Sequence, residues 1–158
     1  MALALRNLVF TLVVPGIGGV LVPWWILTLS DPMAQPAVWL AALVVAVGFA
    51  LYVVCIWNFA SVGRGTPGPW DAPQRFVAVG PYRWVRNPIY IAALLVVVGE
   101  AWLYASLPVL LYAGLMALFF HLFVISYEEP TLTQRFGTTY AEYRASVSSW
   151  LPRPPHSR

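Results

Sequence analysis

Four long apolar stretches limit what this chain can fold into. They cover about residues 8–29, 37–59, 89–104 and 108–127. Each is close to the roughly 20 residues that a helix needs to cross the ~30 Å hydrocarbon core of a bilayer. Hydrophobic residues make up 60% of the 158-residue chain and charged residues only 9%, too few to cover a soluble domain. We therefore expect an all-α polytopic membrane protein, a single domain with about four transmembrane helices.

The arginines predict how these spans are oriented. All nine basic residues are arginine. With four crossings, each falls on the side that holds the N-terminus, the segment 60–88 and the C-terminal tail. The two short loops on the other side, near Asp31 and Ser106, contain none. Because basic residues gather on the cytoplasmic side, we expect both termini in the cytoplasm. The protein would be multi-pass in a cell membrane, the inner membrane if the source is bacterial.

Charge and cysteine counts exclude several classes of function. A net charge of +3 without a basic stripe predicts no nucleic-acid partner. The single cysteine, Cys55, excludes an intrachain disulfide and a cysteine-based metal site, and we expect no metal centre. Gly16, Gly18 and Gly19 are spaced for a close helix contact within or between subunits, so the oligomeric state stays open.

Two cytoplasmic segments contain most of the residues that are suited to chemistry. The loop 60–88 is rich in glycine and proline, which predicts turns, and four aromatic residues predict that it is ordered: Trp70, Phe76, Tyr82 and Trp84. The tail predicts an amphipathic helix over residues 131–147. Its apolar stripe recurs at spacings of three and four, at Leu132, Phe136, Tyr140, Tyr143 and Val147.

Glu100 is the one charged residue inside a predicted span. About eleven residues into the third stretch, it is expected near the bilayer midplane, where a carboxyl is costly unless it is paired or faces a polar cavity. It is therefore either a protonated carboxyl bonded to a neighbouring helix or a functional group. His121, nearer the cytoplasmic end of the fourth span, would meet it if the two helices are neighbours.

The segment GPYRWVRNPIY, residues 80–90, is the densest group of specific side chains. Pro88 suits the first turn of the third helix, and Asn87 suits its N-cap. The free amides of a helix N-terminus bind anions, and Arg, Tyr and Asn side chains suit a carboxylate or an adenine edge. The segment predicts a helix entry that also binds a ligand.

Glu128 and Glu129 come directly after the fourth span. Acidic side chains at the C-terminus of a helix oppose its macrodipole, so two adjacent ones need another reason to be there. They are either two solvated carboxylates at the membrane interface or groups retained for a cationic or polyhydroxyl ligand.

Together these motifs resemble the isoprenylcysteine carboxyl methyltransferase family and its phospholipid N-methyltransferase relatives. The stretches that carry the resemblance are GPYRWVRNPIY, the apolar helix after it, EEPTL, FGTTYAEY and the closing WLPR, over about residues 63–153. The first two spans match only in being hydrophobic. The resemblance implies an integral membrane methyltransferase that binds S-adenosylmethionine in a cytoplasm-facing pocket without a Rossmann domain.

The resemblance also implies roles for individual residues. The cofactor contacts would come from Gln74, Arg75, Phe76, Val77, Tyr82, Asn87, Pro88, Ile89, Tyr90, Glu128 and Glu129. We expect Arg86, Tyr90 and Glu100 at the reacting centre. The family's usual Arg-His-Pro is Arg86-Asn87-Pro88 here, and a basic residue expected one turn before the acidic pair is Val124. These departures weaken the case for a prenylcysteine carboxylate substrate.

Three functions are compatible with the sequence. The first is methyl transfer from S-adenosylmethionine to an oxygen, nitrogen or sulfur atom of a lipid-like or small hydrophobic acceptor, which would enter from the bilayer. The second is a membrane reductase that uses NAD(P)H. The third is a small helical transporter or assembly subunit in which Glu100 and His121 form a polar path. Beyond a hydrophobic substrate and membrane lipids, we expect no particular partner.

Overall fold

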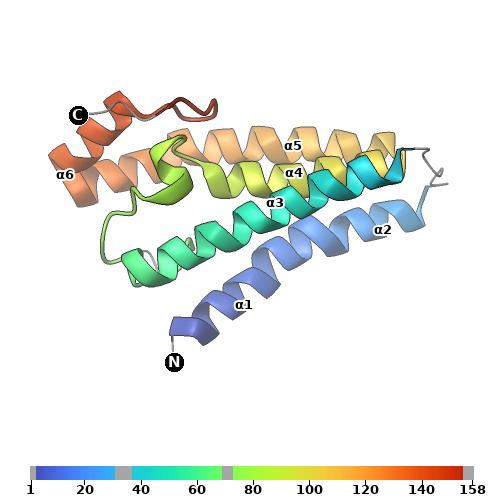
Figure 1. Ribbon diagram of the computed structural model, residues 1–158, viewed down its shortest axis with the longest axis horizontal. Helices are drawn as coiled ribbons and strands as arrows, with labels where there is room; N and C mark the ends of the chain where they lie inside the picture. Colours follow the sequence, from blue (N-terminus) through green and yellow to red (C-terminus); the bar gives the residue numbers. More distant parts are fainter. Residues whose placement is uncertain (1–2, 31–36, 69–72, 155–158) are drawn as a thin grey trace.

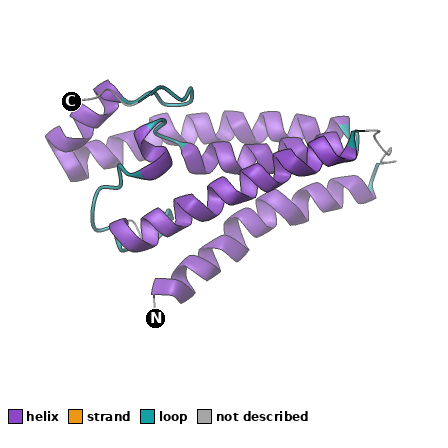
Figure 2. Cartoon of the chain, in the orientation of Figure 1, coloured by secondary structure: helices purple, strands orange, loops and turns teal. Residues whose placement is uncertain are grey.

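The computed structural model describes residues 3–30, 37–68 and 73–154, and within these ranges every regular element is helical (Figure 2). Four helical rods form the bundle. The first joins α1 (Leu3–Gly16), the π-helical turn η1 (Ile17–Leu21) and α2 (Val22–Thr28). The second joins α3 (Val38–Asn58) and the π-helical η2 (Phe59–Gly63). The expected all-α fold is confirmed.

The third and fourth rods form a hairpin. A short 3₁₀ helix, η4 (Gly80–Arg83), precedes α4 (Pro88–Leu103). The fourth rod joins α5 (Leu107–Phe123), the π-helical η5 (Val124–Glu128) and α6 (Glu129–Ser146). Among the described residues, three helical runs are long and apolar enough to span a membrane, and α4, with 16 residues, is a shorter apolar helix.

The predicted boundaries were wrong where the chain changes from apolar to polar. The first helix begins at Leu3, before the predicted residue 8, and the second continues to Gly63 inside the predicted loop 60–88. Glu128 and Glu129 do not end the fourth helix, which continues from η5 into α6, so no helix terminus opposes them. The helical backbone satisfies its own hydrogen bonds in water as well as in lipid, so a change of solvent need not end a helix.

The start of α1, the end of α6 and the described part of the loop between η2 and α4 lie at the same end of the bundle, toward the left of Figure 1. The arginines within the described residues accordingly gather at this end: Arg6, Arg64, Arg75, Arg83, Arg86, Arg135, Arg144 and Arg153. Arg158, and Trp70 of the predicted ordered loop, lie outside the described residues. The predicted one-sided distribution of arginine is therefore present in the fold.

The closest helix contact joins α3 and α4, not the first span. A Cβ built on Gly48 of α3 would lie 2.9 Å from the Ala92 carbonyl oxygen and 3.0 Å from the Val96 nitrogen of α4. The three glycines of the first span show no such contact: a Cβ on Gly19 would meet nothing within 4 Å. Small residues let helix backbones approach closely in a membrane, and here they serve the α3–α4 pair.

Replacing Gly48 with alanine should destabilise the bundle by about 1–3 kcal/mol, because the new methyl group meets backbone atoms that cannot move independently. The matched control is Gly114→Ala in α5, where a Cβ would meet nothing within 4 Å. We expect the control to leave stability unchanged or raise it by up to about 1 kcal/mol. Chemical denaturation in detergent measures both. Equal stability of the two variants would contradict the packing described for α3 and α4.

Candidate active site

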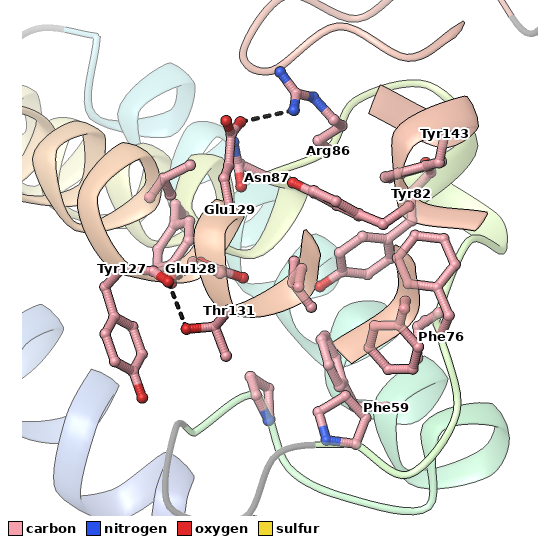
Figure 3. A pocket seen from close by; sticks show the side chains of 18 of the residues that line it. Phe59, Phe76, Tyr82, Arg86, Asn87, Tyr127, Glu128, Glu129, Thr131 and Tyr143 are labelled. Carbon is pink, nitrogen blue, oxygen red and sulfur yellow. Dashed lines mark hydrogen bonds and ion pairs between the residues drawn. The ribbon is translucent and has the colours of Figure 1, made fainter. Parts of the chain in front are cut away.

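A cavity opens at the arginine-rich end of the bundle, where the loop, η4, the start of α4 and the fourth rod meet (Figure 3). Aromatic side chains form much of its wall, and they come from segments far apart in the sequence: Phe59, Phe76, Tyr82, Phe123, Tyr140 and Tyr143. Among the described residues, its charged lining consists of Arg86, Glu128 and Glu129. With these groups ionised, one positive and two negative charges give the described lining a net charge of −1.

A buried ion pair joins the two halves of this cavity. Arg86, just before α4, places its Nη1 atom 2.7 Å from Oε1 of Glu129 at the start of α6. The second carboxylate oxygen of Glu129 lies 3.2 Å from Nη2 of Arg144. Arg86 and Glu129 are only 13% and 10% exposed, whereas Arg144 is 55% exposed. Arg86 is therefore the main counter-charge of Glu129, and the pair fixes α6 against the start of α4.

Glu128 has no such counter-charge. The Tyr90 hydroxyl donates a 2.8 Å hydrogen bond to Oε2 of Glu128, and the described residues offer this carboxylate no cation within ion-pair distance. A buried carboxylate held only by a neutral donor favours a positively charged ligand in the space beside it. Tyr90 itself is packed against Phe120 of α5, with ring centroids 4.6 Å apart.

A second cavity lies deeper in the bundle and shares a border with the first. Its far walls are apolar and come from the first rod and from α5, with Phe10, Val14, Met116 and Phe119 among them. The border residues, which line both cavities, are Phe59, Tyr82, Arg86, Asn87, Tyr90 and Glu128, with Pro67 beside them. The cavity that Glu129 also lines and the deeper cavity, whose far walls are apolar, thus meet at Tyr90 and Glu128.

Tyr82 contributes a buried polar group to this border. Its hydroxyl has no hydrogen-bond partner among the described residues, although the side chain is only 5% exposed. Burial, and secondarily the neighbouring Cys55 thiol, raises the pKa of Tyr82 well above its ordinary value. The phenol is therefore neutral and can donate a hydrogen bond into the cavity.

The aromatic wall depends on a kink inside α6. Gly137 has φ 52° and ψ −124°, a conformation that only glycine adopts readily, and it turns the helix between Phe136 and Tyr140. Phe76 of the loop then packs against both sides of the kink, with ring centroids 5.4 Å from Phe136 and 4.9 Å from Tyr143. The predicted single stripe over 131–147 is therefore bent around the cavity.

The residues after α6 form a strap, residues 147–153, that crosses the start of α4. The side-chain nitrogen of Asn87, Nδ2, donates two hydrogen bonds to Ser149. One, of 3.1 Å, goes to the backbone carbonyl oxygen, and the other, of 2.9 Å, goes to the side-chain hydroxyl. The Arg86 backbone N–H donates to the Ser148 carbonyl at 2.8 Å, and that of Arg153 to the Trp84 carbonyl at 2.9 Å. Asn87 is the N-cap residue of α4, as predicted, but its side chain makes no capping bond.

The predicted site residues divide into three groups. Eight line the first cavity: Phe76, Val77, Tyr82, Arg86, Asn87, Tyr90, Glu128 and Glu129. Ile89 lines only the second cavity. Gln74 and Arg75 are exposed and line neither; their backbone N–H groups bond to the Gly63 carbonyl and hold the loop in place. Pro88 is buried in the first turn of α4 and also lines neither.

The structure does not bring Glu100 to this site. It lies in the last turn of α4, ten residues from Tyr90, which corresponds to ~15 Å along the helix. Glu100 lies three residues before Leu103, where α4 ends, and its position near the bilayer midplane stays a prediction. It does not meet His121 either, whose Nδ1 atom instead accepts a 3.2 Å hydrogen bond from the strap residue Trp150.

Several lining residues were not among the predicted site residues. Phe59, Phe123, Tyr127 and Thr131 line the first cavity, as do Phe136, Tyr140 and Tyr143. The helical stripe in the tail was a usable signal for Phe136, Tyr140 and Tyr143, because an apolar stripe on a cytoplasmic helix must cover something. Phe59 carried no signal, since the predicted span simply ended there.

The fold and the site define a helical protein with helices able to span a membrane and a cavity lined by aromatic and charged side chains at one end. A model of the phospholipid methyltransferase family matches residues 36–139. The chain belongs to this family and is a membrane methyltransferase. The resemblance was expected to begin at about residue 63, but the match begins earlier and includes the second span. It ends before the strap. No match was found among curated proteins.

The Arg86–Glu129 pair should matter far more to stability than the Arg144–Glu129 pair. Arg86→Gln leaves a buried carboxylate without its main partner, and we expect a loss of about 3 kcal/mol. Arg144→Gln removes an exposed partner of the same carboxylate and should cost less than about 1 kcal/mol. Chemical denaturation of both variants in detergent provides the measurement. A larger loss in the Arg144 variant would refute the described hierarchy.

Replacing Asn87 with leucine should release the strap. Hydrogen exchange at the Arg86 and Arg153 amides should accelerate roughly tenfold, because the two bonds to Ser149 are lost. Asn58→Leu is the control, since the Asn58 amide donates only a long 3.5 Å bond to the Val79 carbonyl. Exchange rates that rise equally in both variants, or in neither, would mean that Asn87 does not hold the strap.

Proposed function

We propose that this chain transfers a methyl group from S-adenosylmethionine to a lipid-like or small hydrophobic acceptor. One observation carries the proposal: a cavity lined by Arg86, Glu128 and Glu129 at the arginine-rich end and a deeper cavity with apolar far walls share a border at Tyr90 and Glu128. A soluble, charged cofactor and an apolar acceptor differ in the surroundings they require, and this border is where the two would meet.

The first cavity fits S-adenosylmethionine by charge. The cofactor has a sulfonium, an ammonium and a carboxylate, and its net charge of about +1 complements the −1 of the cavity lining. Glu128, which has a hydrogen bond from Tyr90 but no cation beside it, would hold a cationic group or the ribose hydroxyls. The Nε atom of Arg86 is buried and lacks a partner among the described residues, and it would serve the carboxylate.

The aromatic wall fits the rest of the cofactor. Phe76, Phe136, Tyr140 and Tyr143 present faces and edges on which an adenine ring can pack, and aromatic faces attract a sulfonium cation. The buried Tyr82 hydroxyl would donate its unused hydrogen bond to the same ligand. The residues present therefore match the chemical groups of this cofactor.

The chain's own residues would act mainly by alignment. S-adenosylmethionine supplies a methyl group that is already activated, so no strong general base is required for a nucleophile that carries a free lone pair. Tyr90 and Glu128 would fix the reacting groups at the border of the two cavities, and the aromatic side chains would keep water out. The acceptor atom would be oxygen, nitrogen or sulfur.

The site would face the cytoplasm of a cell membrane. The arginines of the described residues lie at the end that carries the first cavity, and the positive-inside rule places such an end in the cytoplasm. S-adenosylmethionine would then reach the site from the cytoplasm, and the acceptor from the bilayer. Both termini would be cytoplasmic, and the source membrane would be the inner membrane if the organism is bacterial.

Neither alternative function accounts for the site as well. A reductase would place the phosphate-bearing NAD(P)H in a cavity whose lining is net negative. A transporter path through Glu100 and His121 would need the two side chains to be neighbours. Glu100 lies near Tyr112 of α5, whereas His121 is nine residues further along the same helix, a distance of ~13 Å. Membership of a methyltransferase family favours the proposed reaction over both.

Binding of S-adenosylmethionine to the purified full-length chain tests the proposal. We expect saturable binding in detergent by isothermal titration, and Glu128→Gln should weaken it at least tenfold, about 1.4 kcal/mol, because the carboxylate faces the cationic ligand. Glu142→Gln removes the same charge from an exposed position on α6 and should bind as the unaltered chain does. No saturable binding at millimolar cofactor would refute the proposed function.

A further inference from the structure

Glu100 is a half-buried polar residue of α4 that the proposed methyl transfer does not use. Its Oε2 atom is buried and has no hydrogen-bond partner among the described residues. An unpaired carboxyl within a membrane-spanning bundle is costly, and such groups face a cavity or a partner. Such a residue is better explained by a group that binds to it than by packing.

The face of α4 that carries Glu100 is also the face that lines the second cavity. Ile89 and Ala93 line this cavity, and Glu100 follows Ala93 by seven residues and Ile89 by eleven. Residues at these spacings lie on one side of an α-helix. On either side of this face, Gly99 packs against α3, and Val97 packs against α5. Glu100 therefore faces the space between α3 and α5, toward η1, with which α4 is in contact.

Glu100 is not itself among the residues that line the second cavity, but Tyr112, a polar residue near it, is. Tyr112 of α5 lines the second cavity and lies close enough to Glu100 to feel its charge. Its hydroxyl donates a 2.8 Å hydrogen bond to the Gly18 carbonyl in the π-helical turn η1, so its oxygen can still accept one. Gly18 and Gly19 line the cavity at this point, and a Cβ on Gly19 would meet nothing within 4 Å.

The end of the second cavity nearest Glu100 suits a small hydrogen-bond donor. The Tyr112 oxygen and the Glu100 carboxyl can both accept hydrogen bonds, and Gly19, where a Cβ would meet nothing within 4 Å, leaves room near Tyr112. The walls between this end and Tyr90 are mostly apolar, so an occupant needs an apolar middle part. The distance of ~15 Å along α4 between Tyr90 and Glu100 sets the length of that part.

We propose that Glu100 and Tyr112 form a subsite for a polar group at the far end of the acceptor. The preferred acceptor is then an amphiphile with two polar ends: the methyl-accepting atom at Tyr90 and Glu128, and a hydroxyl or amine hydrogen-bond donor at Glu100. This subsite rests on the proposed function, because it takes the second cavity to be the acceptor cavity. It would make Glu100 a residue that determines specificity, without contact to the reacting atoms.

Two probes of equal chain length test the subsite. Dodecylamine and 12-aminododecan-1-ol share the amine and the chain, and they differ only in the hydroxyl at the far end. The full-length chain is placed in nanodiscs of zwitterionic lipid, and its unfolding temperature is followed at equal mole fractions of probe in the bilayer. We expect the apparent dissociation constant of the aminoalcohol to be at least about fivefold lower, through the added hydrogen bond.

Variants separate the subsite from other causes of such a preference. Glu100→Leu should abolish the fivefold difference, and Glu142→Leu, at an exposed position on α6, should retain it. Tyr112→Phe should reduce it, and this variant decides the matter if Glu100→Leu does not fold. Equal affinity of the two probes for the unaltered chain, or a preference that persists in both Glu100→Leu and Tyr112→Phe, would overturn the subsite.

S-adenosylmethionine binding, measured on the same samples, distinguishes this result from a failure of the proposed function. Glu100→Leu should bind the cofactor as the unaltered chain does, because Glu100 does not line the first cavity. If the unaltered chain prefers the aminoalcohol but binds no cofactor, the subsite stands and the proposed function falls. If it binds the cofactor but shows no preference between the probes, the subsite falls and the proposed function stands.

Discussion

The ion pair between Arg86 and Glu129 holds together the end of the bundle on which the site depends. It joins the start of α4 to the start of α6, two points 43 residues apart in the chain, through a 2.7 Å contact that is nearly buried. With α6 anchored there, the Gly137 kink directs Tyr140 and Tyr143 back toward Phe76. Because Arg86 pairs with Glu129, Glu128 is the carboxylate of the cavity that has no cation beside it among the described residues.

The bilayer separates the two kinds of chemistry that the site combines. Hydrocarbon excludes charged groups, so the arginines of the described residues and the acidic pair lie at one end of the bundle, while the helices provide an apolar interior. Tyr90 lies where these two environments meet, with its hydroxyl on Glu128 and its ring against Phe120. A membrane methyltransferase needs such a border, because its proposed cofactor and acceptor belong to different solvents.

Much of the site was predictable from residue types and spacing. Glu128, Glu129, Arg86 and Tyr90 stood out because charged and polar groups at a membrane boundary are conspicuous in an apolar chain. Gln74 and Arg75 were misplaced, since a loop sequence does not reveal which of its side chains turn inward. The Asn87 side chain was assigned to a helix cap, but the strap residue Ser149, 62 residues further along the chain, binds it instead.

The sequence by itself determined the helical class, the approximate membrane spans and the side of the bundle on which charge gathers, because these depend on local hydrophobicity and on the cost of charge in lipid. Only the tertiary structure decided that α3 and α4 make the closest contact, that α5 continues through η5 into α6, and that Glu100 lies far from Tyr90. These features depend on which helix faces meet, and contacts between residues distant in the sequence are not encoded in the periodicity of any one segment.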